Sequence, residues 1–332
     1  AALLFSGQKS FLGFSFSMPN WQIAGTPDLA ADFAIRQGTD GGNYVQLLGA
    51  NSGQAMELPP MITQESRLAI SADGTTAAIG AQTGMLLVSI TADELDSIDL
   101  ADTPLADNTG YSIGLSANGD IVFFASNTLG GDGLTRIYRY TRSSAVLETV
   151  AVAEAASTAL ADAQVVATPD GNTAAFVATN YLLWSGSPGD GRGSQIIAAT
   201  RQTNGDWIPT PCSIGPHLHA SEPSISADGR FTAFRATTID TGAAHQVFRH
   251  DRLTETTALA STAADGLPAD AACEVPSIAP NGRYIAFVSK AANLGTAPDG
   301  HTHVWLSDLG PTLTGGTLAL PEKSSAQLPI HL

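Results

Sequence analysis

The chain has 332 residues, of which 43% are hydrophobic and 14% are charged, so it can bury the core of one large domain. Asp and Glu outnumber Lys and Arg by 31 to 15, which gives a formal net charge of −16. Because an acidic surface repels phosphate groups, this balance argues against binding to nucleic acids and to anionic membranes. The abundance of Ala, Ser, Thr and Gly suits an exported bacterial-type protein, so we expect a periplasmic or extracellular location.

Residues 1–49 precede the repeated part of the chain. The first five residues are too few for a transmembrane span or a complete signal peptide. Residues 11–49 predict an irregular antiparallel sheet, whose first strand alternates Phe14 and Phe16 with serines. Its other strands are expected at residues 21–24, 33–37 and 44–48.

A twelve-residue pattern then recurs five times. Each copy has an alternating apolar run, a turn with Asp or Asn before Gly, and a second alternating run, which together predict a β-hairpin. The turn glycines recur every 45 to 58 residues, so the loops absorb the insertions. The copies are Leu68–Ile79, Ile113–Phe124, Val165–Phe176, Pro223–Phe234 and Pro276–Phe287.

Two further runs follow each hairpin, for example residues 246–251 and 256–260. Four antiparallel strands, here named A to D, in roughly 40 to 50 residues match the size of a propeller blade. We therefore predict an all-β fold, a single β-propeller over residues 1–332 with six four-stranded antiparallel blades, five or seven being the alternatives. The expected blades are 11–49, 65–100, 111–152, 163–210, 222–260 and 275–320.

The repeated segments also resemble a known family. Pro223–Arg230 (Pro-Ser-Ile-Ser-Ala-Asp-Gly-Arg), Phe287–Gly295 and Val304–Leu309 are similar to the TolB-like β-propeller repeat, which carries Pro-Asp-Gly or Ala-Asp-Gly at its A–B turn. The resemblance covers about residues 65 to 310. It implies the fold, but propellers of this kind serve as binding scaffolds, as gating domains of peptidases and in some cases as lyases.

Three stretches leave alternatives open. Residues 153–163 are rich in Ala and read as helix in isolation, but the repeat places them in a connection between blades. Acidic residues 92–102 could form one helical turn or a solvated edge. Either residues 3–5 or residues 328–332 could supply a strand that closes the ring, because an unpaired blade leaves exposed edges.

The two cysteines, Cys212 and Cys273, both lie in connections from strand D of one blade to strand A of the next. These connections leave at the same end of the blades as the B–C loops, so a disulfide between neighbouring blades is expected as one possibility, with unpaired thiols as the other. Such a bridge would contribute on the order of 4 kcal/mol in the chain-entropy model.

Five of the seven histidines belong to the same end of the last two blades. His217 and His219 alternate before a hairpin, and His303 begins a third strand, so these three are candidate ligands for a transition metal. Lyases among the propellers that the repeat resembles hold a metal with histidines in such a location. Exposed loop histidines that do not converge are the alternative, and no metal is then bound.

The B–C loops supply the remaining candidates. Residues 179–193 contain Tyr181 and Trp184, which suit a binding surface, and Asp190 in a Gly-Asp-Gly turn. Glu222 and His245 complete the candidate binding face. The glycine-rich turns at residues 130–133 and 189–191 could bind calcium or phosphate, but they match neither the EF-hand loop nor a phosphate-binding loop, so flexible turns are the stronger expectation. The Tyr181 loop could instead pack against its own blade.

These observations predict an exported recognition or scaffold propeller without catalytic activity. It would bind a protein or glycan through the face of its D–A and B–C loops, as a monomer and without a cofactor. The alternative is a metal-assisted polysaccharide lyase or hydrolase with a histidine-bound metal at the channel mouth. A third possibility is one domain of a longer surface or envelope protein.

Overall fold

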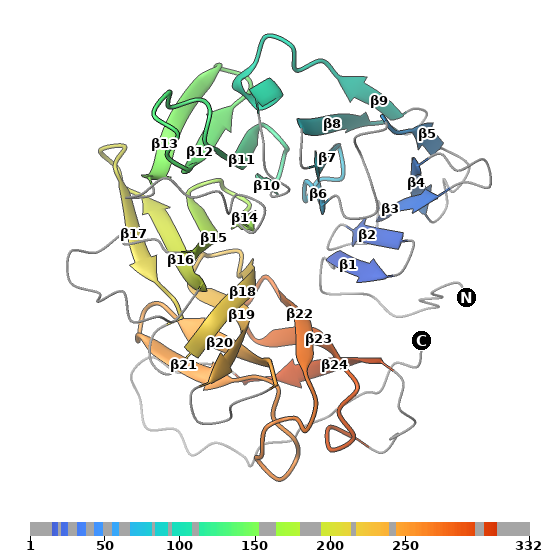
Figure 1. Ribbon diagram of the computed structural model, residues 1–332, viewed down its shortest axis with the longest axis vertical. Coiled ribbons are helices and arrows are strands. Elements are labelled where there is room, and N and C mark those ends of the chain that lie inside the picture. The colour runs from blue at the N-terminus through green and yellow to red at the C-terminus, as the bar shows by residue number, and fades with distance from the viewer. Residues whose placement is uncertain are drawn as a thin grey trace.

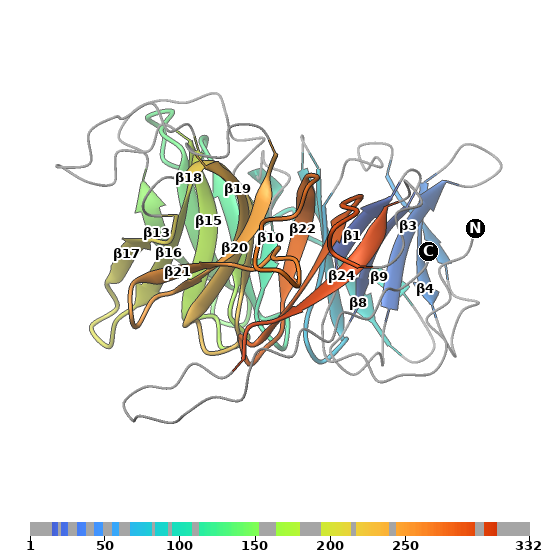
Figure 2. The same cartoon turned by 90° about the horizontal axis from the view of Figure 1, so that it is seen from below.

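The computed structural model is a single β-propeller whose sheets follow one another around a ring (Figure 1). It describes residues 15–18, 21–25, 32–37, 43–48, 55–59, 67–81, 84–91, 95–107, 113–152, 164–179, 194–213, 217–238, 244–295 and 302–310. Figure 2 shows that the sheets stand side by side, with loops at both ends of the strands. In these ranges the only helix is the short η1 (Pro104–Asp107), and none is long and apolar enough to cross a membrane.

Every sheet is antiparallel and is formed by strands that are consecutive in sequence. The N-terminal sheet contains β1 (Ser15–Met18), β2 (Trp21–Gly25), β3 (Asp32–Gln37), β4 (Asn43–Leu48) and β5 (Ala55–Glu57). The next two contain β6 (Arg67–Ile70), β7 (Thr76–Ala81), β8 (Gly84–Ile90) and β9 (Leu95–Ile98), then β10 (Ile113–Leu115), β11 (Ile121–Ser126), β12 (Arg136–Thr141) and β13 (Val146–Val152).

The last three sheets complete the ring. They contain β14 (Val165–Ala167), β15 (Thr173–Thr179), β16 (Ser194–Arg201) and β17 (Trp207–Pro211), then β18 (His217–Ile225), β19 (Phe231–Thr238), β20 (Gln246–Asp251) and β21 (Thr256–Leu259), and finally β22 (Cys273–Ile278), β23 (Tyr284–Ser289) and β24 (His303–Asp308). The first strands β6, β10, β14, β18 and β22 lie nearest the centre of the ring (Figure 1).

The prediction of six four-stranded blades is wrong: the structure has five blades, one of the two alternatives that the sequence left open. Five blades are built on the repeated hairpin; four of them have four strands, and the last has three within the described ranges. The remaining, N-terminal sheet has five strands and lacks the Asp/Asn-Gly turn. Its first four strands lie where the sequence predicted them, but β5 was not expected. The reason is that the β-branched and apolar pattern is weak at Ala55–Glu57, where pairing with β4 determines the strand.

Of the uncertain stretches, the acidic one is described in part. Leu95–Ile98 form β9, the outer strand of their sheet, so the solvated edge is confirmed for these residues. Residues 153–163 and the two segments considered for ring closure lie outside the described residues.

The repeated turns are held by one pattern of hydrogen bonds. In the β18–β19 turn the Ser226 hydroxyl donates to Asp228 (2.6 Å) and accepts from the N–H of Phe231 (2.9 Å). Gly229 has a φ of 71°, a conformation that glycine adopts without the strain a Cβ would cause. The same bonds occur at Ser71, Ser116 and Thr168, so the Ser/Thr-x-Asp/Asn-Gly sequence specifies the turn through its side chains.

Neighbouring blades meet closely at these turns. A Cβ added to Gly119 would lie 2.5 Å from Thr76 of the preceding blade, and one added to Gly171 would lie 2.5 Å from Ile121. The contacted residue always comes two positions after the turn glycine of its own blade. Glycine is therefore required here for its missing side chain as well as for its φ.

A second set of contacts between turns runs through the backbone. The N–H of Asp73 donates to the carbonyl of Ala117, and the N–H of Ala117 donates to the carbonyl of Pro169 (2.9 and 2.7 Å). The N–H of Ala227 then donates to the carbonyl of Pro280 (2.9 Å). Pro169 has no N–H, so it cannot donate onward to the β18–β19 turn.

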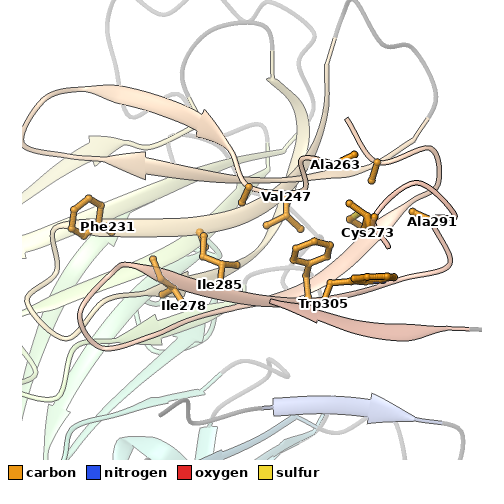
Figure 3. Close-up of a cluster of buried hydrophobic side chains, with 13 residues drawn as sticks. Phe231, Val247, Ala263, Cys273, Ile278, Ile285, Ala291 and Trp305 are labelled. Carbon is orange, nitrogen blue, oxygen red and sulfur yellow. The ribbon is translucent and has the colours of Figure 1, made fainter. Parts of the chain in front are cut away.

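The hydrophobic core is divided into layers between adjacent sheets. The layer between the β18–β21 and β22–β24 sheets contains Phe231, Val247, Cys273, Ile285 and Trp305 (Figure 3). The layer between the β14–β17 and β18–β21 sheets contains Cys212 with small and aromatic side chains of both sheets. Alternation along each strand sends successive side chains into different layers.

The disulfide considered for Cys212 and Cys273 is not formed. Both thiols are free and fully buried, and they belong to the two different layers on opposite sides of the β18–β21 sheet. Cys212 directly follows β17, as expected for a D–A connection, whereas Cys273 is already the first residue of β22. The sequence could not show that each packs as a small apolar side chain in its own layer.

Candidate functional site

Three equivalent residues of the last three blades are linked near the centre of the ring. Gln164, Glu222 and Val275 each stand seven positions before the turn glycine of their blade. The amide oxygen Oε1 of Gln164 accepts a hydrogen bond from the N–H of Glu222 (2.7 Å). The carboxylate Oε2 of Glu222 in turn accepts one from the N–H of Val275 (2.7 Å). The side chains of Gln164 and Glu222 thus each hold the backbone of the next blade.

The inner strands are distorted at these positions. Glu222 and Val275 have φ values of 55° and 52°, and His219 has a φ of 51°. This left-handed region is uncommon for residues other than glycine and strained for a β-branched one such as Val275. The distortion coincides with irregular pairing between β18 and β19 and between β22 and β23. It turns the N–H groups of Glu222 and Val275 toward the preceding blade, where they find their partners.

Arg235 connects this region to the neighbouring blade. Its Nε donates to the Ser221 hydroxyl (2.9 Å) and lies 3.5 Å from Oε2 of Glu222. Its Nη1 donates to Oε1 of Glu274 at the start of β22 (3.2 Å). The Glu274 side chain is half exposed, whereas those of Arg235 and Glu222 are largely buried. One guanidinium therefore joins two carboxylates across the joint between two blades.

His245 lies beside these charges, directly before β20. Its carbonyl accepts a hydrogen bond from the N–H of Cys273 (2.8 Å), which fixes its backbone to the next blade. Burial lowers the pKa of His245, and the charge of Arg235 lowers it further, while Glu274 and Glu222 act in the opposite direction. We call Glu222, Arg235, His245 and Glu274 the junction cluster.

The junction cluster lies at the end of the ring where the D–A and B–C connections leave the sheets. It combines two carboxylates, one guanidinium and one imidazole. Its fixed groups can donate and accept hydrogen bonds, and Glu274 reaches solvent, so the arrangement suits recognition of a polar ligand. Among the residues that the structure describes, no three His, Cys, Asp or Glu side chains are placed to hold a metal ion.

The predicted metal ligands are placed differently from one another. His219 is exposed, whereas His303 is buried beside Trp305, with ring centroids 6.0 Å apart. His217 begins β18 and pairs with Thr238 in the sheet, but its side chain lies outside the described residues. The complete set of three ligands therefore stays a prediction.

Of the predicted binding-face residues, Glu222 and His245 come together in the junction cluster. Tyr181, Trp184 and Asp190 lie outside the described residues. Sequence reasoning missed Gln164 and Arg235. The first had a usable signal, because Gln164 and Glu222 occupy the same position of the repeat. Arg235 had none, since its contact with Glu274 on β22 depends on how the blades pack.

Comparisons with known proteins bear on the fold. No family model matches the chain, and no curated protein matches it. Among solved structures, TolB from Acinetobacter baumannii is 16% identical over 84% of this chain, with a TM-score of 0.50. This chain spans 60% of the length of that TolB.

Two other solved structures match over more of both chains. Kuenenia stuttgartiensis hydrazine synthase is 15% identical over 93% of this chain and 80% of its own, with a TM-score of 0.52. The Cps50 (Swd1) β-propeller domain of Myceliophteria thermophila is 10% identical over 90% of this chain and 97% of its own, with a TM-score of 0.53. Together these similarities support a TolB-like β-propeller fold; at such identities they do not extend to activity.

Proposed function

We propose that the protein is a non-catalytic recognition propeller, exported to the periplasm or cell exterior, which binds a protein or glycan as a monomer through its D–A and B–C loop face. The observation that carries this proposal is the junction cluster. Its charged groups and strained inner strands are fixed at a joint between blades, and His245 of the cluster stands at the end of a B–C connection.

The bonding of the cluster favours recognition. Arg235 already bonds to Ser221 and Glu274, and the Glu222 carboxylate already holds the Val275 N–H, so these groups are positioned before any ligand arrives. Preorganised polar groups lose little conformational entropy on binding. Strained backbone conformations that are kept by their surroundings are also frequent at ligand-binding positions.

The acidic composition limits the ligand. With a formal net charge of −16, the protein repels polyanions over long range, so neutral or cationic ligands meet the lower barrier. Export is supported by the composition, and the TolB-like fold supports a scaffold role only by analogy.

Binding to a glycan array and to proteins of a cell-envelope extract would test the proposal, with the wild type compared with a Glu222→Gln/Glu274→Gln variant. Glu255→Gln is the matched control, because Glu255 is an exposed residue of the turn at the other end of the strands. We expect binding to be lost in the double variant and kept in the control. Binding that is unchanged in the double variant, or cleavage of a bound glycan, would contradict the proposal.

A further inference from the structure

A buried histidine lies between two blades, away from the junction cluster. The side chain of His250, in β20, is 1% exposed. Its Nδ1 lies 3.0 Å from the Thr257 hydroxyl of β21, and its Nε2 is buried with no hydrogen-bond partner among the described residues. A neutral imidazole needs one donor and one acceptor contact, but a protonated one has two N–H groups to satisfy.

His250 belongs to the layer between the β14–β17 and β18–β21 sheets. It is two residues from Phe248, which packs in that layer with Cys212, so both side chains leave β20 on the same face. Thr232, paired with His250 across the sheet, has its hydroxyl 3.7 Å from the Cys212 sulfur. The imidazole therefore lies on the face of β20 that packs against the neighbouring blade. The groups around it on this face are the Thr232 hydroxyl, the Cys212 thiol and the Phe248 ring.

The charged residues near the His250 imidazole are few, and they lie close to it in sequence. Asp251, Arg252 and Glu255 act on His250, and all three belong to β20 or its following turn. Asp251 is engaged by Arg230, and Arg252 donates to the hydroxyl of Thr200 on β16. Among the described hydrophobic residues that form this layer, Cys212 of the opposite sheet is the one with a titratable group. No described carboxylate bonds to the free Nε2.

We propose that His250 makes the contact between the β14–β17 and β18–β21 sheets sensitive to acid, so that a second proton on the imidazole loosens this joint of the ring. Burying an imidazolium with one N–H unpaired costs both a hydrogen bond and the hydration of the charge. Separation of the two sheets lets water reach Nε2 and removes that cost.

The direction of the effect follows from linkage. Burial lowers the pKa of His250 below the ordinary value of about 6.5, so the closed joint holds the neutral ring. The contribution of the neutral His250 imidazole to stability is fully present at pH values above the ordinary histidine pKa. It is lost progressively as the pH falls below it, because the open joint binds the proton more tightly.

The two cysteines of the chain provide the test. Cys212 lies in the joint that His250 faces, and Cys273 lies in the next joint, on the other side of the same sheet (Figure 3). Burial raises the pKa of both thiols to about 11, so their intrinsic reactivities fall together with pH. Cys273→Ala and Cys212→Ala variants each leave one thiol, and labelling by 4,4′-dithiodipyridine measures how often each joint opens.

The expected result is that labelling of Cys212 relative to Cys273 at least doubles between about pH 7.5 and about pH 5, on either side of the ordinary histidine value. The same ratio should stay constant in His250→Gln, which keeps a polar side chain but cannot be protonated. A constant ratio in the wild-type background, or an equal rise in His250→Gln, would overturn the proposal.

A second measurement does not depend on the folding of the variant. Amide hydrogen exchange of the unaltered protein, corrected for the intrinsic effect of pH, should accelerate at acid pH in β16, β17 and β19. It should not accelerate in β22 and β23, which flank the joint without His250. Equal acceleration in both groups would also reject the proposal.

Discussion

The carboxylate of Glu222 accepts a hydrogen bond from the backbone N–H of Val275, the residue at the equivalent position of the next blade. Gln164 does the same for Glu222. A side chain of one blade thus satisfies a backbone donor of its neighbour that is turned out of the normal strand conformation. This relationship joins the stability of the ring to the geometry of the junction cluster.

Glu222→Ala should lower the free energy of unfolding by about 1–3 kcal/mol, because the N–H of Val275 loses its partner in a partly buried position. Glu274→Ala is the matched control, since it removes the other carboxylate that contacts Arg235 from a half-exposed position. Glu274→Ala should lower the free energy of unfolding by no more than about 1 kcal/mol. Urea unfolding of both variants makes the comparison, and equal losses would contradict this role of Glu222.

Gly119→Ala should destabilise the protein by more than Gly131→Ala. Both glycines have positive φ values, 67° and 73°, but a Cβ on Gly119 would lie 2.5 Å from Thr76, whereas one on Gly131 would have no atom within 4 Å. We expect about 1–2 kcal/mol for the backbone strain at Gly131 and a larger loss at Gly119. Thermal unfolding measures both. Equal losses would show that close packing between the turns does not matter.

Ala145→Gly should stabilise the protein by up to about 1 kcal/mol. Ala145 has a φ of 54° in the exposed turn between β12 and β13, and glycine removes the left-handed strain at some cost in unfolded-chain entropy. Ser144→Gly is the matched control, because Ser144 has a negative φ and gains nothing from glycine. Chemical unfolding should show opposite signs for the two variants; the same sign would refute the argument.

The ion pair between Arg283 and Asp308 should make stability fall in acid. The hydrogen bonds from Arg283 lower the pKa of Asp308 below its ordinary value of 3.8. The contribution of the ion pair to the free energy of unfolding is therefore fully present above pH 3.8. It is lost as the pH falls from there through the lowered pKa of Asp308. Arg283→Gln/Asp308→Asn should show a flatter decline of the melting temperature below about pH 4 than the unaltered protein. Parallel curves would contradict this.

Reducing agent should leave the melting temperature unchanged. Cys212 and Cys273 are free thiols in different core layers, so no covalent bond is available to break. Native thiols should also react slowly near neutral pH, because burial raises the pKa of each to about 11 and keeps the nucleophilic thiolate scarce. A lower melting temperature in the presence of dithiothreitol would contradict this and would show that a disulfide is present.

The fold could be predicted because the repeated residues form each turn through hydrogen bonds between near neighbours in sequence. Ser226, Asp228 and Gly229 make a turn through bonds within five residues, so the pattern identifies each hairpin wherever it occurs. The number of blades could not be predicted in the same way. β5 has little strand pattern of its own, and its pairing with β4 is set by the assembled sheet.

The candidate site was predictable only for residues whose position in the repeat places them near it. Glu222 and His245 were singled out from sequence, and Gln164 shares the repeat position of Glu222. Arg235 contacts Glu274 across 39 residues of sequence and between two blades, a contact that no local pattern encodes. The same limit explains the cysteines, whose separation depends on which face of a sheet each one occupies.

Pro169 makes the boundary between the β14–β17 and β18–β21 sheets different from the boundaries beside it. At those neighbouring boundaries the turn of the earlier blade donates a backbone N–H to a carbonyl in the turn of the later one. Pro169 has no N–H, so its residue cannot supply the corresponding bond. The two turns instead meet through side chains, since a Cβ added to Gly229 would lie 3.0 Å from the Thr173 hydroxyl oxygen. The contact between these two turns therefore depends on the shape of the threonine side chain and on the absence of one at Gly229.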